Sequence, residues 1–585
     1  FFLYNKEMKG IEIFFKTLEK EGVDYIFSPP NSFGKKVDKL FSDKFSKSKM
    51  KKIISGNEQG ASHMADGYAR TTGKPGIVVC DSDTSGTNTI TGLQTANMDS
   101  APMVVFICHF SENENLSNIF DQIDHIGISR STTKHNFLCE KVEDLSRVLR
   151  EALYLSTTGR PGTILVDIPK QVLDSETKFT FPTIKKVSGY KIPKEAKSVD
   201  IKKAAKLIMN SKRPIVFGGG GIIISEATEA LRKFANRLKI PVTLTLMGLG
   251  GYPPDDPMRV SWIGMHGSYF ANMAVHNSDL VISIGARFDD RSTGGVFEKF
   301  APNAKVIHID IDPSTINKNI VVHCPIVGDA KTVINQISKE IPMSFKPNTE
   351  DRLAWFNQIK DWENENPTVA RQKGKMIKTS YAIDLISKIT KGKAVVVTDV
   401  GQHQMWVAQY YQFANPRNQI TSGGLGTMGF GFPAAIGAKL GRPNDTVLAI
   451  CGDGSFQMNM QEFSTAVENQ LDLKIILINN GHHGMVRQWQ TLFFDKNYSC
   501  CKFDLNPDYV KIAQSYGAKA FKIDSPNDLE GSFKEGLSTK GVVLMEVVVD
   551  HTEMVYPMLT PGGTMDDMLL SPDDPIPDGP VPDMS

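Results

Sequence analysis

Thr446–Asn480 reads TVLAICGDGSFQMNMQEFSTAVENQLDLKIILINN, and the rest of the chain is best understood from this stretch. It contains an apolar run of strand length at Thr446–Cys451, a turn at Gly452–Ser455, a polar helix-like segment and a second apolar run at Leu473–Ile478. This order predicts two parallel strands joined by a helical crossover. The polar residues that follow each strand then lie at the carboxyl edge of a sheet, where open parallel sheets bind ligands.

The turn after the first strand has the chemistry of an anion site. Gly452 and Gly454 let the backbone turn sharply and approach a ligand. The backbone amides of Gly454 and Ser455 then point outward at the start of a helix, where phosphate groups bind well. We therefore expect this turn to hold a diphosphate.

Oxygen atoms around the turn also suit Mg²⁺. Asp453 and Asn480 each offer a hard oxygen, and the main-chain carbonyl of His482 offers a third. Mg²⁺ prefers about six oxygen ligands and readily takes phosphate oxygens among them. A Gly-Asp-Gly turn alone is common and only occasionally marks a cofactor site. Its combination with two asparagines after the second strand is far more specific.

Four segments carry a resemblance to a known family. Gly452–Ser455, followed some two dozen residues later by Asn479-Asn480, resembles the thiamine diphosphate and Mg²⁺ signature of thiamine diphosphate-dependent enzymes. Thr421–Gly429 (TSGGLGTMG), Gly401–Trp406 (GQHQMW) and Gly484–Trp489 (GMVRQW) resemble the catalytic subunit of the acetohydroxyacid synthase (acetolactate synthase) family. The match covers nearly the whole chain without large gaps.

Length and composition limit the class of protein. With 585 residues, of which 41% are hydrophobic, the chain is long enough for about three or four globular domains. The net charge of +1 argues against nucleic acid or a membrane surface as a partner. No apolar run approaches the roughly 18–20 residues of a membrane span. We expect small molecules and other copies of the chain as partners.

Cysteine usage and the first residues bear on the compartment. The seven cysteines lie mostly in apolar runs without metal-ligand spacing, which suits a reducing compartment. Adjacent Cys500 and Cys501 are most simply two small apolar residues, although a redox role stays open. The start Phe1-Phe-Leu-Tyr4 has no targeting pattern, so a targeting segment was removed or never existed. We expect a cytoplasmic protein, or a plastid or mitochondrial one if a transit peptide was removed.

The chain predicts an α/β fold of three doubly wound domains with largely parallel sheets, since helix-like and strand-like segments alternate. The expected parts are a pyrimidine-binding domain at 1–180, a linker at 181–198, an FAD-binding domain at 199–345, a charged helical connector at Thr349–Glu365, a diphosphate and Mg²⁺ domain at 376–550 and a tail at 551–585. The first and third domains are expected to be similar folds. The tail's acids and prolines predict a mobile segment or a lid.

Glu58 is the main catalytic candidate. It lies in Asn57–Ala61, ahead of an expected helix at Ser62–Arg70, and an isolated glutamate there would most often be a helix cap. The family resemblance favours a role in activating thiamine diphosphate, through hydrogen bonding to N1′ of its aminopyrimidine. The resemblance also implies cofactor contacts from Asn88, Gln402, His403, Gly452, Gly454, Ser455, His482 and Gly484.

The glycine-rich loop at 421–429 supplies further expected contacts. The resemblance implies that Met428 holds the cofactor in a bent shape and that the Gly426 carbonyl accepts from its 4′-amino group. An ordinary core methionine is the alternative for Met428. Other family positions line the substrate channel or an inhibitor site at its mouth, namely Phe120, Lys170, Met265, Arg287, Asp290, Met485, Val486, Trp489 and Phe493. Trp489 is expected to discriminate acceptor size.

A flavin is expected in the central domain. The strand-like Pro214–Phe217 runs into Gly218–Gly221, which alone is weak evidence for a dinucleotide. The segments at 264–267, 285–291 and 308–313 resemble FAD-binding segments of the family. The resemblance implies a largely structural FAD, contacted by Arg160, Gly219, Gly220, Met265, His266, Arg287, Arg291, Asp310 and Asp329. The alternative is a surface cluster of ion pairs.

The resemblance implies a reaction and an assembly. Thiamine diphosphate attacks the keto carbon of pyruvate, CO₂ leaves, and the remaining carbon fragment joins a second 2-oxo acid. Glu58 and Asp453 lie in different domains, and in the family they come from different subunits. The expected assembly is a homodimer or homotetramer with active sites at the subunit interface, joined by a small regulatory subunit.

First-domain loops depart from the family pattern. Pro30–Phe33 replaces P-G-G-A, Asp81–Asn88 replaces T-S-G-P-G-A-T-N, Cys108–Ser111 replaces G-Q-V-P, and Asp121 replaces a glutamine. These changes add bulk and negative charge where substrate is expected. Three hypotheses therefore stay open: acetohydroxyacid synthase, a related carboligase or decarboxylase acting on another substrate, and a catalytically silent regulatory paralogue.

Overall fold

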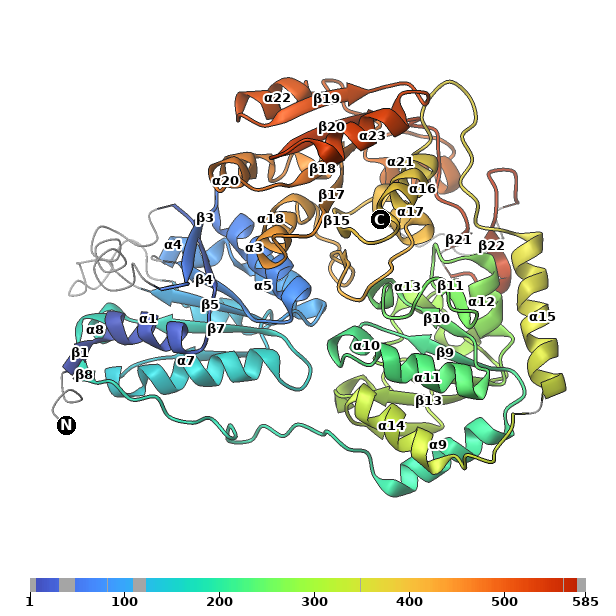
Figure 1. Ribbon diagram of the computed structural model, residues 1–585, viewed down its shortest axis with the longest axis horizontal. Coiled ribbons are helices and arrows are strands. Elements are labelled where there is room, and N and C mark those ends of the chain that lie inside the picture. The colour runs from blue at the N-terminus through green and yellow to red at the C-terminus, as the bar shows by residue number, and fades with distance from the viewer. Residues whose placement is uncertain are drawn as a thin grey trace.

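The computed structural model describes residues 7–30, 48–80, 83–108, 123–347, 349–560 and 562–575 (Figure 1). They form three six-stranded sheets, and the strand pairs within these sheets are parallel. Long apolar strands with buried residues on both faces are typical of parallel sheets covered by helices. The predicted α/β class with doubly wound parallel sheets is confirmed.

The first sheet has the strand order β3-β2-β4-β5-β7-β6. Its strands are β2 (Tyr25–Ser28), β3 (Lys51–Ile54), β4 (Gly76–Cys80), β5 (Met103–Cys108), β6 (His135–Leu138) and β7 (Thr163–Ile168). The described helices are α1 (Gly10–Lys20), α3 (Glu58–Thr72), α4 (Asp83–Thr87), α5 (Ile90–Met98), α6 (His125–Ser129), α7 (Val142–Thr157) and α8 (Lys170–Asp174). β1 (Glu7–Lys9) pairs antiparallel with β8 (Glu176–Lys178).

The central sheet has the order β11-β10-β9-β12-β13-β14, which is the 3-2-1-4-5-6 order of dinucleotide-binding folds. Its strands are β9 (Pro214–Gly218), β10 (Val242–Leu244), β11 (Arg259–Trp262), β12 (Leu280–Ile284), β13 (Lys305–Asp310) and β14 (Cys324–Val327). Its helices are α9 (Ser198–Asn210), α10 (Gly221–Ile224), α11 (Thr228–Leu238), α12 (Tyr269–His276), α13 (Asp290–Thr293), α14 (Ala330–Glu340) and the 3₁₀ turns η1 (Leu246–Gly248), η2 (Phe297–Lys299) and η3 (Pro313–Thr315).

The third sheet has the order β16-β15-β17-β18-β20-β19, the same relative order as the first. Its strands are β15 (Val395–Thr398), β16 (Gln419–Ile420), β17 (Val447–Gly452), β18 (Lys474–Asn479), β19 (Lys519–Ile523) and β20 (Val543–Val548). Its helices are α16 (Thr379–Thr390), α17 (Gln402–Tyr410), α18 (Gly431–Gly441), α19 (Asp453–Phe456), η4 (Met460–Glu462), α20 (Phe463–Glu468), α21 (Gly484–Phe493), α22 (Tyr509–Ser515) and α23 (Leu529–Ser538). The predicted crossover is confirmed, with β17 and β18 each shifted by one residue from expectation.

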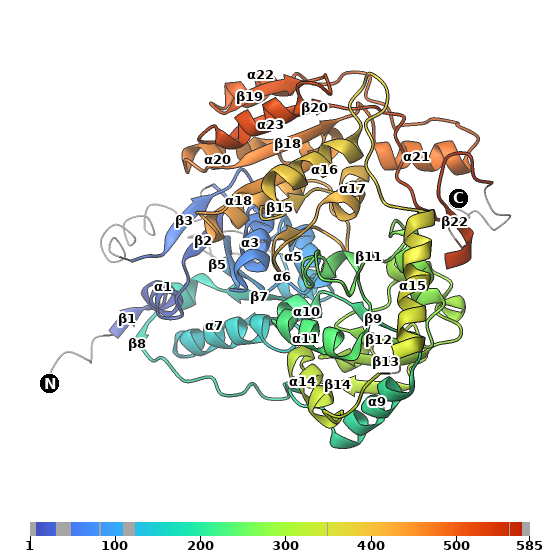
Figure 2. The ribbon, with the colours of Figure 1, turned by 45° about the vertical axis from the view of Figure 1, so that its right-hand side comes forward.

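The first and third domains share a core. Helices α3 and α18 lie side by side between the two sheets (Figures 1 and 2), and buried residues of both domains form one apolar cluster. A Cβ at Gly67 would stand 2.0 Å from the Ala434 carbonyl oxygen, and one at Gly437 would stand 1.8 Å from that of Met64. Glycine at both positions lets the helices approach backbone to backbone.

The connecting segments agree in part with expectation. The segment at 181–197 contains no helix or strand, and the charged connector is α15 (Thr349–Glu365), as predicted. The expectation that the tail builds no core is wrong for its first half, because Val555, Leu559 and Met565 are buried. β21 (Met558–Leu559), η5 (Met565–Asp567) and β22 (Met568–Leu569) pack on the central domain. Among the described residues, no helix is long and apolar enough to cross a membrane.

Candidate functional site

The carboxyl edge of the third sheet gathers the predicted diphosphate and metal residues. Asp453 begins α19 directly after β17, and its carboxylate accepts from the amides of Gly454 (3.0 Å) and Gly481 (2.7 Å). The residue is only 2% exposed, and burial raises the pKa of its carboxyl to about 7. Within the described residues no ion pair reaches Asp453. A bound dication would supply the missing charge and stabilise the carboxylate form.

Asn480 and His482 lie opposite this turn. The Asn480 side-chain oxygen accepts from the backbone amide of His482 at 2.9 Å, while the His482 imidazole Nδ1 is 2.8 Å from the Asn480 carbonyl oxygen. In the described part of the chain, no three His, Cys, Asp or Glu side chains are grouped as a metal site. The expected set contains a single carboxylate, so it fits a cation whose other ligands are phosphate or water oxygens.

A small cavity of about 100 Å³ lies among these residues. It is lined by Val400, Gly401, Gln402, His403, Trp406, Met428, Gly452, Asp453, Gly454, Ser455, Ile478, Asn480, His482, His483, Gly484, Met485 and Val486. Most of the predicted third-domain residues are thus brought together. The cavity is smaller than the roughly 300–1,000 Å³ of typical ligand pockets, so a cofactor bound here must extend past this domain.

His403 makes the cavity suitable for an anion. Its imidazole is buried, burial lowers its pKa to about 4, and its Nε2 atom has no hydrogen-bond partner in the structure. A Cβ at Gly452 would stand 2.9 Å from the His403 Nδ1 atom. The glycine is therefore required for the backbone to pass the ring, and an unpaired buried nitrogen is best explained by a ligand.

The loop before α18 carries Gly426 and Met428, and Met428 lines the cavity. Gly426 has φ +73, which favours glycine. Asp399, directly after β15, accepts from the amides of Gly429 and Gly431, each at 2.9 Å. Asp399 is fully buried and its pKa is raised to about 6 by burial. Sequence reasoning missed Asp399, although an aspartate after an apolar strand was a usable signal.

Glu58 is the first residue of α3, four residues earlier than the expected helix start. The helix is capped by Asn57, whose side chain accepts from the Gly60 amide at 2.7 Å. Glu58 is therefore not the N-cap of α3. The Glu58 carboxylate accepts from the Ser85 hydroxyl (2.9 Å) and from the Asn88 amide (2.8 Å). Glu58 and Asn88 thus come together, but neither lines the third-domain cavity.

Other predicted substrate residues are scattered. Lys170 begins α8 after β7, at the same sheet edge as Glu58. The Trp489 and Phe493 rings meet edge to face on α21 with centroids 5.4 Å apart, on the same helix as the cavity residues Met485 and Val486. Phe120 and the divergent loop residues Phe33, Phe110 and Asp121 lie outside the described residues, as does the side chain of Asp83.

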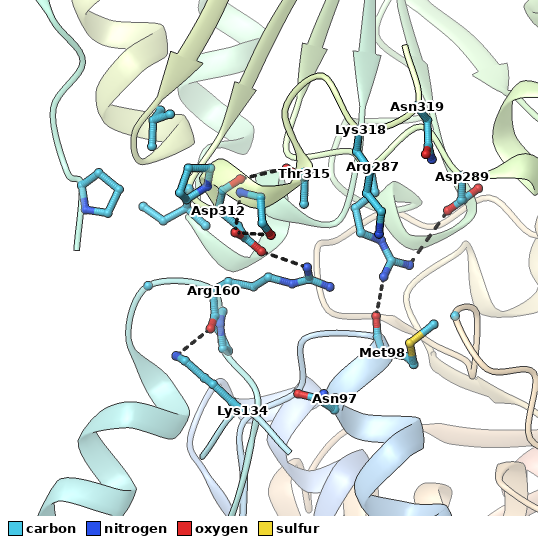
Figure 3. A pocket seen from close by; sticks show the side chains of 18 of the residues that line it. Asn97, Met98, Lys134, Arg160, Arg287, Asp289, Asp312, Thr315, Lys318 and Asn319 are labelled. Atoms are coloured by element: carbon cyan, nitrogen blue, oxygen red, sulfur yellow. Dashed lines mark hydrogen bonds and ion pairs between the residues drawn. The ribbon is translucent and has the colours of Figure 1, made fainter. Parts of the chain in front are cut away.

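A second, larger site lies between the first and central domains, with Gly423 and Gly424 of the third domain also in its lining (Figure 3). Two adjoining cavities of about 1070 and 450 Å³ share lining residues such as Arg160 and Arg287. The Arg160 guanidinium pairs with Asp312 at 3.1 Å, and Arg287 donates to the Met98 carbonyl oxygen at 2.8 Å. Partly exposed ion pairs are present, as the alternative reading supposed, but they line a cavity rather than a flat surface.

The smaller of these cavities lies where the central strand order reverses. β9 and β12 are neighbours there, and Gly220 and Gly285 follow them into the cavity lining. A dinucleotide is expected at this switch point of an open parallel sheet. Of the predicted flavin residues, Arg160, Gly220, Arg287, Arg291, Asp310 and Asp329 line one or both cavities. Burial raises the pKa of the Asp310 carboxyl to about 6.

Three predicted flavin residues face elsewhere. A Cβ at Gly219 would stand 2.1 Å from the Gly285 carbonyl oxygen, so this glycine serves close packing. Met265 accepts at its carbonyl from the Leu559 amide (2.8 Å), and the buried His266 Nδ1 is 3.3 Å from the Pro557 carbonyl oxygen. Met265 and His266 therefore contact the C-terminal segment.

Lys134 was missed by sequence reasoning and lines the larger cavity. Its ammonium donates to the carbonyl oxygens of Leu155, Thr158 and Arg160 at 2.6–2.8 Å. Figure 3 shows the bond to Arg160. Burial lowers its pKa to about 8. Because these carbonyls end helix α7 and begin the turn to Arg160, Lys134 fixes where Arg160 enters the cavity. No local motif marks such a residue.

Comparison with known proteins gives the same picture over the whole chain. Three thiamine pyrophosphate enzyme domains match: the N-terminal TPP binding domain at residues 8–128, the central domain at 201–337 and the C-terminal TPP binding domain at 399–547. The acetolactate synthase large subunit of Haemophilus influenzae is 43% identical over 569 residues, covering 97% of this chain and 99% of that protein. Acetolactate synthase isozyme 3 large subunit of Escherichia coli is 38% identical over 96% of this chain and 99% of its own length.

A plant protein is similar to the same extent. Acetolactate synthase 1, chloroplastic, of Oryza sativa is 38% identical over 97% of this chain and 88% of its own length. Similarity of this degree across three domains establishes the family. The chain belongs to the acetolactate synthase large-subunit family of thiamine pyrophosphate enzymes.

Proposed function

We propose that this protein catalyses thiamine diphosphate-dependent synthesis of 2-acetolactate, a step of branched-chain amino-acid biosynthesis. Two molecules of pyruvate give one 2-acetolactate and one CO₂, with no net oxidation or reduction. With 2-oxobutyrate as the acceptor, the product is 2-aceto-2-hydroxybutyrate. The observation that carries the proposal is full-length similarity to acetolactate synthases together with retention of Glu58, Asp453 and Asn480 at sheet edges.

Thiamine diphosphate, when bound, supplies a nucleophilic carbon and an electron sink for decarboxylation. We propose that Gly454 and Ser455 bind its diphosphate through backbone amides, and that His403, protonated next to the bound anion, donates to it from Nε2. Asp453, Asn480 and the His482 carbonyl would hold Mg²⁺ against the same phosphates. The buried, cation-free Asp453 carboxylate and the unpaired His403 nitrogen support this placement.

We propose that Glu58 has a different role, which is to stabilise the protonated pyrimidine ring of the cofactor. Its carboxylate stands at a helix start, with Ser85 and Asn88 as hydrogen-bond donors. From there Glu58 would accept a hydrogen bond from the pyrimidine ring of the cofactor and so promote loss of the C2 proton. Met428 would shape the bound cofactor, and the Gly426 carbonyl would accept from its amino group.

FAD is the proposed occupant of the cavities between the first and central domains. Their position at the central switch point and their basic lining by Arg160 and Arg287 suit a dinucleotide. Since the reaction transfers no electrons overall, the flavin would be structural. Purified protein should take up FAD, and its visible absorbance should stay that of the oxidised flavin during turnover.

A homodimer or larger homo-oligomer is proposed, because none of the described first-domain residues of the same chain lines the third-domain cavity. Glu58 of a second copy would complete each site. Co-expression of Glu58→Gln and Asp453→Ala chains tests this, because a mixed dimer regains one intact site only if the two residues act across subunits. Mixed dimers with no more activity than either parent would contradict the shared site.

Two further assignments rest on the relatives. The names of several relatives contain "large subunit", which supports a small regulatory subunit as a partner. The bacterial relatives support a cytoplasmic protein, while the chloroplastic plant relatives favour a plastid location. Pull-down of this chain from its native cells would test the small subunit, and fractionation of those cells would test the compartment.

Four first-domain loops depart from the family pattern, and these loops bear on the choice of acceptor and donor. Trp489, in edge-to-face contact with Phe493 on α21, is the proposed size filter for the acceptor. The decisive experiment is a product assay with pyruvate alone, and with pyruvate plus 2-oxobutyrate or an aldehyde. Acetolactate from pyruvate alone supports the proposal. Product formed only with another acceptor would favour a divergent carboligase instead.

A further inference from the structure

The short turn Met98–Ser100, at the end of α5, contacts all three domains. Met98 and Ser100 line the cavities between the first and central domains. Asp99, between them, also lines the smaller cavity, but its buried carboxylate contacts the third domain. Ser100 has φ +59, a conformation that non-glycine residues rarely adopt.

The Asp99 carboxylate holds the start of the loop that carries Gly426 and Met428. One oxygen accepts from the Gly424 amide at 2.7 Å, and the other accepts from the Gly423 amide at 3.0 Å. The Asp99 side chain is 0% exposed, so both bonds are shielded from water. An anchored main chain at Gly423-Gly424 restricts where the following five residues can lie.

Arg70 of helix α3 reinforces this anchor. Its guanidinium pairs with Asp99 at 3.0 Å and donates to the Thr421 carbonyl oxygen at 2.7 Å, while it is also paired with Asp66. The Asp66 and Asp99 side chains are both 0% exposed, but among the described residues the Asp66 carboxylate accepts from Arg70 alone. Two buried carboxylates therefore share one guanidinium, and only Asp99 touches the loop.

The same turn reaches the interdomain cavities through both neighbours of Asp99. The Met98 carbonyl oxygen accepts from Arg287 at 2.8 Å, and the Ser100 hydroxyl accepts from Arg160 at 2.9 Å. Arg160 and Arg287 line both cavities, so an anionic occupant would bind them and fix the turn that they hold. Figure 3 shows Arg287 reaching down to Met98 across the larger cavity.

We propose that Asp99 is a positioning residue that fixes the 421–430 loop, and that the Met98–Ser100 turn couples occupancy of the interdomain cavity to thiamine diphosphate binding. The inference rests on the proposed function for the identity of the two ligands. It gives the structural flavin a defined effect on a site in another domain. Coupling of this kind is reciprocal, so thiamine diphosphate should strengthen FAD binding by the same factor.

Hydrogen–deuterium exchange of the cofactor-free protein tests the anchor without either ligand. Asp99→Asn keeps one acceptor oxygen but puts an amide NH₂ against one of the two backbone N–H groups, so exchange in the 421–430 segment should rise about tenfold. Asp66→Asn is the matched control, because it removes the same buried charge without touching the loop. Equal exchange in the wild type and Asp99→Asn, or an equal rise in both variants, would overturn the role of Asp99.

Titration of Mg²⁺ and thiamine diphosphate, with and without saturating FAD, tests the coupling. In the wild type FAD should lower the thiamine diphosphate Kd, and in Asp99→Asn the Kd should rise about tenfold and no longer respond to FAD. Ser100→Ala keeps Asp99 and should reduce the FAD response while leaving loop exchange unchanged, which preserves the test if Asp99→Asn does not fold. Wild type that binds neither ligand would refute the proposed function, whereas wild type that binds both without mutual effect would refute only the coupling.

Discussion

The first and third domains have the same strand order but unequal shares of the candidate site. Their equivalent helices, α3 and α18, cross at reciprocal glycines, with Gly67 against Ala434 and Gly437 against Met64. The two domains are thus related by an approximate twofold arrangement within one chain. A similar pair of folds was expected from the sequence, and the common order confirms it.

The two domains also exchange carboxylates in a matching way. Asp99 lies in the connection between the third and fourth strands of the first sheet and binds the amides ahead of α18. Glu462 lies in the equivalent connection of the third sheet and accepts from the Gly56 amide, ahead of α3, at 3.0 Å from each oxygen. Each domain therefore holds the loop that precedes the other domain's central helix.

The difference lies after the first strand of each sheet. The third domain has Asp399 there, which binds the loop ahead of α18 from within the same domain, whereas the first domain has Pro29. The loop ahead of α3 thus depends more on the third domain than the loop ahead of α18 depends on the first domain. The third domain carries the proposed diphosphate cavity, and the first carries Glu58 and the loops that depart from the family pattern. In the proposed function, this divides the site into a cofactor half and a substrate half.

Glu58→Gln should have the largest effect and would separate the two halves functionally. Glutamine keeps the size and part of the hydrogen bonding, but it cannot stabilise a protonated pyrimidine ring as a carboxylate does. Proton exchange at C2 of bound thiamine diphosphate should fall about 10²–10⁴-fold, with the cofactor Kd nearly unchanged. Exchange measured by NMR after rapid quench needs no knowledge of the substrate. Equal rates in both proteins would return Glu58 to the status of a helix-terminal residue.

Gly437→Ala should disturb the contact between the two domains. The new Cβ would stand 1.8 Å from the Met64 carbonyl oxygen, so α18 must move away from α3. Overpacking of this kind costs about 1–3 kcal/mol or more, and the thermal midpoint should fall. Gly531→Ala in α23 is the control, since nothing lies within 4 Å of its Cβ position, and the helix should gain slightly. A thermal midpoint unchanged by Gly437→Ala would show that α3 and α18 can move apart without loss of stability.

Local pattern predicted the third domain well, because its chemistry is contiguous in sequence. The strand at β17, the turn at Asp453 and the strand at β18 lie within one crossover, so hydrophobic runs and glycines were sufficient signals. The contacts that hold the loops were not predictable in this way. Asp99 binds a residue 324 positions away, and Glu462 binds one 406 positions away. An isolated acid after a helix gives no sign of such a partner.

The prediction for the tail at 551–585 relied on composition and was wrong for its first half. The acids and prolines of residues 571–585 dominated the expectation for everything past 550. The apolar residues Val555, Met558 and Leu559 come before that stretch and are buried. Val555 also exchanges backbone hydrogen bonds with the Gln488 side chain, at 2.8 and 3.1 Å, which ties this segment to α21. A segment should be divided where its composition changes, not where the last long strand ends.

Glu462→Gln should have the smallest effect and would sharpen the comparison most. Glu462 is buried, burial raises the pKa of its carboxyl, and it also accepts from the Thr465 hydroxyl at 2.8 Å. Glutamine would place an NH₂ group against the Gly56 amide, so the start of α3, and Glu58 with it, should become less well fixed. We expect C2 proton exchange to slow by about tenfold or less, which corresponds to the cost of one unsatisfied buried group.

The matched control for Glu462→Gln is Glu553→Gln. Glu553 is mostly buried and also accepts at a helix start, from the Thr379 amide at 2.5 Å and the Ser380 hydroxyl at 2.6 Å, but it holds α16 rather than α3. Both variants should lose stability, whereas only Glu462→Gln should slow C2 exchange at saturating cofactor. An equal slowing in both would mean that general loosening, not the position of Glu58, sets the rate. If neither variant slows C2 exchange, the first-domain residues Asn57, Ser85 and Asn88 are sufficient to hold Glu58. The contact of Glu462 with the start of α3 would then stabilise the fold without affecting the rate.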